Sequence, residues 1–187
     1  MCDLSWRSAC KEGVHMKVRN KQMVWWLLAT VAWMAFIFYK SSQTYADQDL
    51  RPTLAAWLPL PILEQWLPHI EFTYDGGLVT WKQPYDFVEF FIRKGAHVTE
   101  YAILAFLVIR TLLAMKWERW VAIVIGALIC VAYAASDEWH QSFVPNRTGH
   151  AIDVVVDSIG VVLVVLLFLI AGLFSRRKGK RRGLHFP

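Results

Sequence analysis

Three groups of polar side chains recur at helical spacing within apolar stretches of this 187-residue chain. The first occupies positions 94, 97, 100 and 101, the second positions 136, 137, 140 and 141, and the third positions 153 and 157. Steps of three and four residues place the members of each group on one face of a helix. Each group therefore forms a polar stripe on an otherwise apolar helix.

These stripes carry residue types suited to acid–base chemistry and to anion binding. Carboxyl groups crowded together at low dielectric acquire different pKa values. Residues of the same type can then supply a general base and a general acid. The candidate catalytic residues are His97, Glu100, Asp137, Glu138, His140, Asp153 and Asp157. The candidate substrate-binding residues are Lys94, Gln141 and Arg147, because the two bases can hold a phosphate or sugar-phosphate group.

Within this set we expect His97 and Glu100 to form the acid–base or ligand pair and Arg147 to contact an anion. We expect the whole set to converge in one pocket, because polar groups exposed separately to lipid would be costly. Two structural explanations compete with a site. The side chains could be hydrated at the membrane boundary, or Arg147 and Lys94 could simply hold carboxylates together.

The sequence specifies neither a metal nor another cofactor. Histidine together with carboxylates suits Zn²⁺ or Mn²⁺, so a metal site stays an open alternative. The His-x-x-Glu spacing at 97–100 is not the His-Glu-x-x-His pattern of zinc proteases, and Cys2, Cys10 and Cys130 have no metal or redox spacing. No Gly-x-Ser-x-Gly turn is present to favour a serine nucleophile.

The composition indicates which elements must position these residues. Apolar residues make up 56% and charged residues 19% of the chain, against 45–50% and about 25% in soluble domains. Four apolar stretches, 23–39, 95–115, 120–135 and 151–174, approach the roughly 20 residues needed to span a bilayer. We therefore predict an all-α membrane protein, a bundle of four transmembrane helices.

The distribution of Lys and Arg predicts the orientation of this bundle. Thirteen of them lie before the first span, between spans two and three, or after span four, and six lie on the opposite side. Basic flanks remain cytoplasmic, so we expect both termini inside a bacterial cytoplasmic membrane and the polar stripes at its outer face. Because the net charge of +5 arises at the chain ends, it does not indicate a nucleic-acid partner.

Three segments follow from these assignments. Residues 1–22 form a cytoplasmic N-terminal segment, of which we expect 1–15 to be disordered. Residues 23–174 form the membrane domain, and residues 175–187 a basic cytoplasmic tail.

The membrane domain contains a long outer insert, residues 41–84. Prolines at 52, 59, 61 and 68 break it too often for a fifth span, so we expect short amphipathic helices on the outer leaflet. Residues 71–81 carry β-prone side chains on both sides of Asp75-Gly76-Gly77 and predict a small hairpin.

The motifs also resemble those of a known family. Five segments are similar to the successive motifs of the VanZ family of small bacterial membrane proteins. They are residues 38–43, 93–101, 137–141 and 143–147, followed by Asp153…Asp157-Ser-Ile-Gly160. The family is named for an accessory factor in resistance to the glycopeptide antibiotic teicoplanin. The resemblance implies a role in the cell envelope.

Three classes of function remain open at this point. The first is an enzyme acting on a lipid-linked envelope substrate, such as a phospholipid or a cell-wall precursor. The second is a non-enzymatic protein that binds or transports a lipid or lipophilic antibiotic, for which we expect four helices to require a homo-oligomer. The third is a structural partner of an envelope protein complex.

Overall fold

The computed structural model describes residues 4–145, 147 and 149–182, with side chains from residue 20 to residue 174 within those ranges. In chain order the elements are α1 (Leu4–Ser41), η1 (Ala46–Gln48), α2 (Arg51–Trp57), α3 (Leu60–Trp66), β1 (Glu71–Tyr74), β2 (Gly77–Thr80), α4 (Pro84–Ala114), α5 (Arg119–Gln141) and α6 (Ala151–Arg182). The chain is thus helical apart from one two-stranded sheet.

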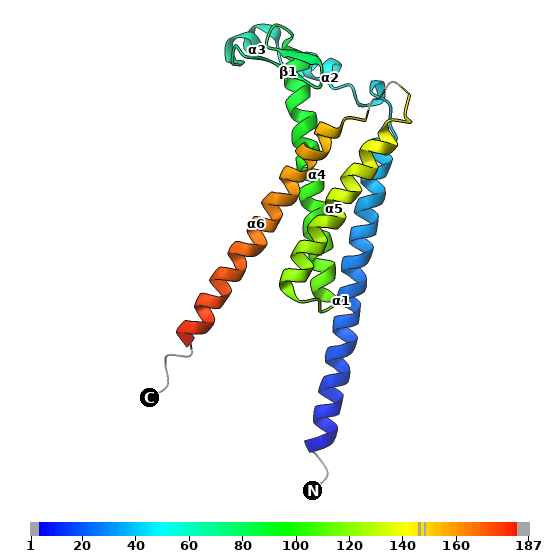
Figure 1. Ribbon diagram of the computed structural model, residues 1–187, viewed down its shortest axis with the longest axis vertical. Coiled ribbons are helices and arrows are strands. Elements are labelled where there is room, and N and C mark those ends of the chain that lie inside the picture. The colour runs from blue at the N-terminus through cyan, green and yellow to red at the C-terminus, as the bar shows by residue number, and fades with distance from the viewer. Residues whose placement is uncertain (1–3, 146, 148, 183–187) are drawn as a thin grey trace.

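The four expected spans are confirmed as four long apolar helices. The segments long and apolar enough to cross a membrane are Asn20–Ser41, Pro84–Ala114, Arg119–Gln141 and Ala151–Phe174. Figure 1 shows α1, α4 and α5 side by side, whereas α6 diverges from them toward the C-terminus. Both chain ends lie at one end of the bundle, and residues 41–84 lie at the other, which we call the insert end.

The helices are longer than the apolar stretches that predict them. Helix α4 begins at Pro84 rather than at 95, because Pro is well suited to the first turn and no further proline interrupts residues 85–114. Helix α5 continues to Gln141 rather than ending at 135. As a result, two of the polar stripes lie on unbroken helices.

The N-terminal helix also differs from expectation. We expected residues 1–15 to be disordered, whereas the backbone is helical from Leu4 onward; residues 1–3 lie outside the described residues. No proline occurs between Leu4 and Ser41 to stop this helix before the apolar stretch.

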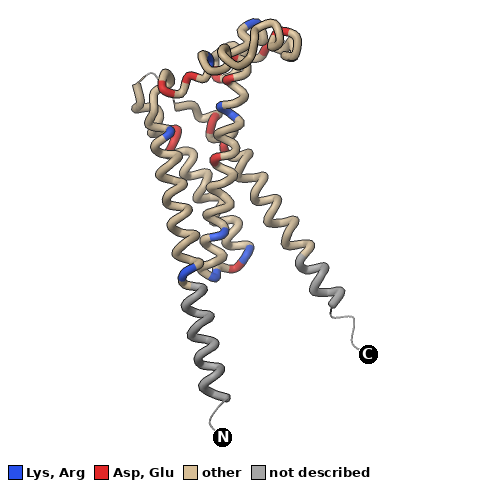
Figure 2. Tube along the Cα trace, turned by 180° about the vertical axis from the view of Figure 1, so that it is seen from behind, with Lys and Arg blue, Asp and Glu red and all other residues tan. Residues whose placement is uncertain are grey.

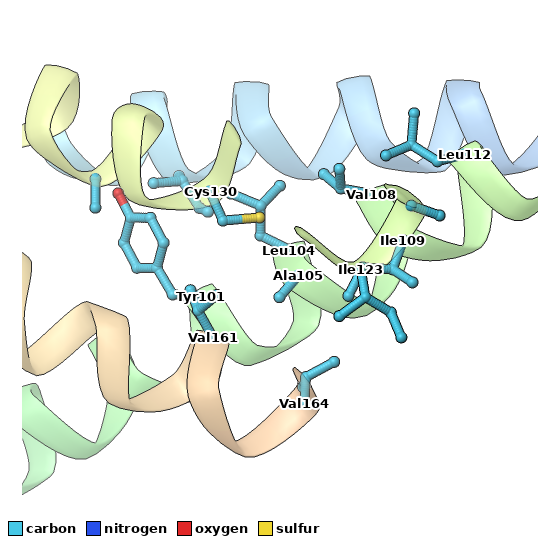
Figure 3. Close-up of a cluster of buried hydrophobic side chains, with 13 residues drawn as sticks. Tyr101, Leu104, Ala105, Val108, Ile109, Leu112, Ile123, Cys130, Val161 and Val164 are labelled. Atoms are coloured by element: carbon cyan, nitrogen blue, oxygen red, sulfur yellow. The ribbon is translucent and has the colours of Figure 1, made fainter. Parts of the chain in front are cut away.

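The core lies where α4 packs against its three neighbours. Leu104, Ala105 and Ile109 of α4 are fully buried, together with Cys130 of α5 (Figure 3). Helix α6 approaches most closely at Gly160, where an added Cβ would lie 2.9 Å from the backbone nitrogen of Ala102 and closer still to the carbonyl oxygen of Val98. This glycine therefore sets how near α6 comes to the polar stripe of α4.

The insert has the elements that its sequence predicts. The hairpin pairs Glu71 with Thr80 and Tyr74 with Gly77, and its turn places Asp75 and Gly76 at positive φ. Helices α2 and α3 have seven residues each, too few to cross a bilayer. Their contact with the outer leaflet stays a prediction.

Candidate polar site at the insert end

Two adjoining cavities occupy the insert end of the bundle. The first, of about 440 Å³, lies beneath the hairpin and is bordered by α4 and the start of α6; we call it the hairpin cavity. The second, of about 390 Å³, lies between the end of α1, residues 47–53 and α4; we call it the α1–α4 cavity. Arg93, His97 and Arg147 line both, so these three side chains stand between the two spaces.

His97 and Asp157 form the deepest pair of the site. The distance from His97 Nδ1 to Asp157 Oδ1 is 3.3 Å, and the Asp157 side chain is completely buried. Neither carboxylate oxygen of Asp157 has a hydrogen-bond partner within the described part of the chain. His97 can therefore be oriented by a buried carboxylate while it also lines the cavities.

Lys94 and Asp153 form a second charge pair, nearer the mouth of the hairpin cavity. Lys94 Nζ lies 2.5 Å from Asp153 Oδ1, and the hydroxyl of Tyr74 donates a hydrogen bond to the same oxygen. Burial and this carboxylate acceptor raise the pKa of the Tyr74 hydroxyl above its usual value. These bonds connect the hairpin to the first turn of α6.

Residues at the end of α5 form a buried hydrogen-bond network with neighbouring segments. Gln141 Nε2 donates to Asp137 at 3.0 Å and to Glu138 at 3.3 Å. The Ser41 hydroxyl donates to Asp137 at 2.7 Å, and the backbone N–H of His150 donates to Glu138 at 3.0 Å. These carboxylates connect α5 to the end of α1 and to the loop before α6, which is a structural contribution in itself.

Arg147 is charged but has no carboxylate partner in the part of the chain that the structure describes. Its Nη1 donates to the backbone carbonyls of Ser41 and Gln43, at 3.0 and 3.1 Å. Among the described residues no carboxylate comes within 4.0 Å of it, whereas Arg93 and Lys94 each have one within that distance. Burial, and next the positive charge of Arg93, lower the pKa of the Arg147 guanidinium, as expected for a cation short of compensating charge.

The structure brings five of the ten expected site residues to one cavity, whereas Glu100 lines only the α1–α4 cavity and Asp137 and His140 line a separate pocket. Lys94, His97, Gln141, Arg147 and Asp153 line the hairpin cavity. His140 faces away from it: its ring stacks on Phe38 at 4.4 Å, and its Nε2 lies 3.1 Å from the Ser42 hydroxyl.

The roles of His97 and Glu100 as the acid–base or ligand pair stay a prediction, and the structure adds Asp157 as a neighbour of His97. His97 and Glu100 both line the α1–α4 cavity, but the carboxylate in ion-pair distance of His97 is that of Asp157. The close approach of α6 to α4 at Gly160 brings Asp157 to His97.

Two further residues of the site were not assigned a role from the sequence. Glu89 is only 2% exposed and accepts hydrogen bonds from the backbone of Leu50 and the hydroxyl of Tyr45. Arg93 lies 3.6 Å from Glu89, and its guanidinium covers the Tyr45 ring at 4.6 Å. The i, i+4 spacing of Glu89 and Arg93 is a sequence signal that could have identified them as a pair. No sequence signal indicates that Tyr45 of the insert contributes to the site.

Within the described residues, no three His, Cys, Asp or Glu side chains are arranged so that they could hold a metal ion. The acidic residues are concentrated at the insert end, as Figure 2 shows, and several of them are paired with cations. The site therefore presents charge pairs around two cavities, with Arg147 as the cation between them that lacks a carboxylate partner in the described structure.

Fold and site together define a multi-pass helical membrane protein with a polar site at one end of its bundle. The chain belongs to the VanZ/LLP1 family, whose model matches residues 26–172 and so includes every candidate site residue and the whole insert. No curated protein and no solved structure matches it.

Proposed function

We propose that this protein binds the phosphate-bearing head group of a membrane lipid or lipid-linked envelope precursor in the hairpin cavity. The observation that carries the proposal is the position of Arg147, a half-buried guanidinium that lines both cavities and lacks a carboxylate partner among the described residues. A guanidinium offers its N–H groups to phosphate in a planar fork, and burial strengthens that attraction.

The other charges around the cavity are consistent with a single anionic ligand. Glu89 offsets Arg93, Asp153 offsets Lys94, and the lining carboxylates of Asp86 and Asp75 pair with Arg51 and His150. An incoming phosphate would therefore meet Arg147 as a cation of the wall that has no carboxylate within 4.0 Å among the described residues. Tyr45, Tyr74, Phe87 and Phe90 add ring surface that can contact an acyl chain or a sugar face.

The His97–Asp157 pair favours catalysis as a second function. A histidine oriented by a buried carboxylate is a common general base, and His97 lines the same cavity that Arg147 lines. On this alternative the bound head group would be the substrate and His97 would accept or donate a proton.

Binding can be tested with purified protein in detergent. The probe is short-chain phosphatidylglycerol, with short-chain polyprenyl phosphate as a second anion. We expect Arg147→Gln to weaken binding about tenfold, as for loss of one charge-assisted contact, and Arg147→Lys to weaken it less. Arg110→Gln is the matched control, because Arg110 is exposed and stacks on Trp26 away from the cavities.

Equal binding by wild type and Arg147→Gln would refute the proposal. Binding that survives His97→Gln, with no change in the lipid after incubation, would favour recognition over catalysis.

Because VanZ-type proteins take their name from a teicoplanin-resistance factor, we also propose a link to that resistance. Expression in a susceptible bacterium should raise teicoplanin tolerance, and Arg147→Gln should abolish the increase.

A further inference from the structure

A third pocket lies on the other side of α5, separate from the two cavities of the candidate site. It has a volume of about 240 Å³ and is formed by the ends of α1 and α5 and the first residues after α5. Figure 1 shows these two helix ends side by side at the insert end. Its lining residues are Phe38, Tyr133, Ser136, Asp137, Trp139, His140 and Phe143.

Most of the wall of this pocket is aromatic. Trp139 and Phe143 meet edge to face with ring centroids 5.3 Å apart, and their side chains are 70% and 67% exposed. Phe38 is 51% exposed and stacks on the ring of His140. Aromatic side chains attract organic cations through their negative ring faces, so this wall could contact such a cation.

The remaining wall contains a buried carboxyl group. Asp137 is 3% exposed, and its Oδ2 accepts the hydrogen bonds from Ser41 and Gln141. Its Oδ1 is buried and has no hydrogen-bond partner within the described structure. No Lys or Arg of the described residues lies within 4.0 Å of this carboxyl group, so a cation in the pocket would be its ion-pair partner.

We propose that this pocket binds an organic ammonium group. The aromatic rings would contact the alkyl surface and charge of the ammonium, and Asp137 would supply the opposite charge. The group could come from the ethanolamine head of a lipid or from a soluble amine, because both present the same cation. This inference does not depend on phosphate binding in the hairpin cavity, which uses other residues.

The test measures binding to the full-length protein in detergent with three probes. These are short-chain phosphatidylethanolamine, its N-acetylated derivative, which lacks the ammonium charge, and tetramethylammonium. We expect phosphatidylethanolamine or tetramethylammonium to bind saturably. N-acetylation should weaken the binding of the lipid about tenfold. Asp137→Asn, which keeps the shape and one carbonyl acceptor, should weaken ammonium binding at least about tenfold.

Two variants keep the proposal testable if Asp137→Asn fails to fold. Trp139→Leu and Phe143→Leu alter exposed rings, and each should weaken ammonium binding severalfold. Trp57→Leu is the matched control, because Trp57 is 81% exposed on α2 and does not line this pocket. Arg147→Gln should leave tetramethylammonium binding unchanged, because this probe has no phosphate.

The outcomes are distinct. Competition between tetramethylammonium and phosphatidylethanolamine, lost in Trp139→Leu, would support the site and show that a lipid can supply the cation. Binding of tetramethylammonium alone would support it with a soluble amine as the source. Binding of neither probe, or lipid binding that is unaffected by N-acetylation and by Trp139→Leu, would overturn the proposal.

Discussion

His97 of α4 and Asp157 of α6 face each other across the helix contact that Gly160 permits, with 3.3 Å between Nδ1 and Oδ1. The Asp157 carboxylate is fully buried. Within the described structure, its ion-pair partner is His97. Removing one member of such a pair leaves a buried charge without compensation, which costs more than removing both.

We therefore expect His97→Leu to lower the free energy of unfolding by about 3 kcal/mol. The double variant His97→Leu/Asp157→Leu should lose clearly less than the sum of the two single variants. Denaturant unfolding in detergent, arranged as a double-mutant cycle, measures the difference. Additive effects of the two substitutions would show that the pair does not interact.

The contact between α4 and α6 depends on the absence of a side chain at position 160. Gly160→Ala would place a methyl group against the backbone of Val98 and Ala102, so we expect a loss of about 2 kcal/mol of stability from overpacking. Gly95→Ala, in α4, is the control, because nothing lies within 4 Å of an added Cβ there. It should be neutral or stabilise α4 by about 0.5 kcal/mol. Thermal unfolding of the two variants in the same detergent tests this, and equal melting temperatures would contradict it.

The hairpin is held over its cavity by the bond from Tyr74 to Asp153. Tyr74→Phe removes the hydroxyl but keeps the ring that packs on Phe90 and Lys94. Loss of one hydrogen bond of about 1 kcal/mol should speed amide exchange in residues 71–80 about fivefold. Hydrogen–deuterium exchange with mass spectrometry measures this. Tyr85→Phe, which removes a hydroxyl bonded to the carbonyl of Leu58, should leave hairpin exchange unchanged.

The insert contains a carboxylate whose titration can be followed directly. Hydrogen bonds from the side chain and backbone of Arg51 lower the pKa of Asp49 from 3.8 to about 2. Because the pKa is depressed in the folded protein, the stabilisation is present above about pH 4 and is lost as the pH falls toward 2.

Carbon-13 NMR of labelled aspartate carboxyls should give this low midpoint for Asp49, and Arg51→Gln should raise it toward 3.8. The carboxyl of Asp47 is the internal control. Hydrogen bonds from Thr44 hold its pKa below the usual value, so Arg51→Gln should not affect it. A midpoint near 3.8 for Asp49 in the wild type would show that the Arg51 contact does not form.

The orientation predicted from the basic residues can be tested by labelling. In a background with Cys2 and Cys10 replaced by Ser, Asp75→Cys lies in the hairpin turn and Lys116→Cys in the turn between α4 and α5. An impermeant thiol reagent added to intact cells should label position 75, and position 116 only after permeabilisation. The reverse pattern would place both termini outside.

The family, the four spans and the hairpin follow from local features of the sequence. Uncharged apolar length predicts each span, and the Asp75-Gly76 pair predicts the turn because both residues tolerate positive φ. The i, i+3 and i+4 spacings also identify the polar face of each helix. These properties depend on residues close together in the chain, so no tertiary contact is needed to infer them.

The partners of those residues were decided only by the tertiary structure. A stripe limits a side chain to one face of its helix, but the rotation and separation of the helices determine what it meets. The close approach at Gly160 places Asp157 of α6 beside His97, a contact that the spacing within α4 does not predict. The rotation of α5 sends His140 to Phe38 and away from the cavities, although Gln141 of the same predicted stripe lines the hairpin cavity. Likewise, the return of the insert over α4 brings Tyr45 to Glu89 and Arg93, a contact between segments too distant in the chain for any spacing rule to reveal.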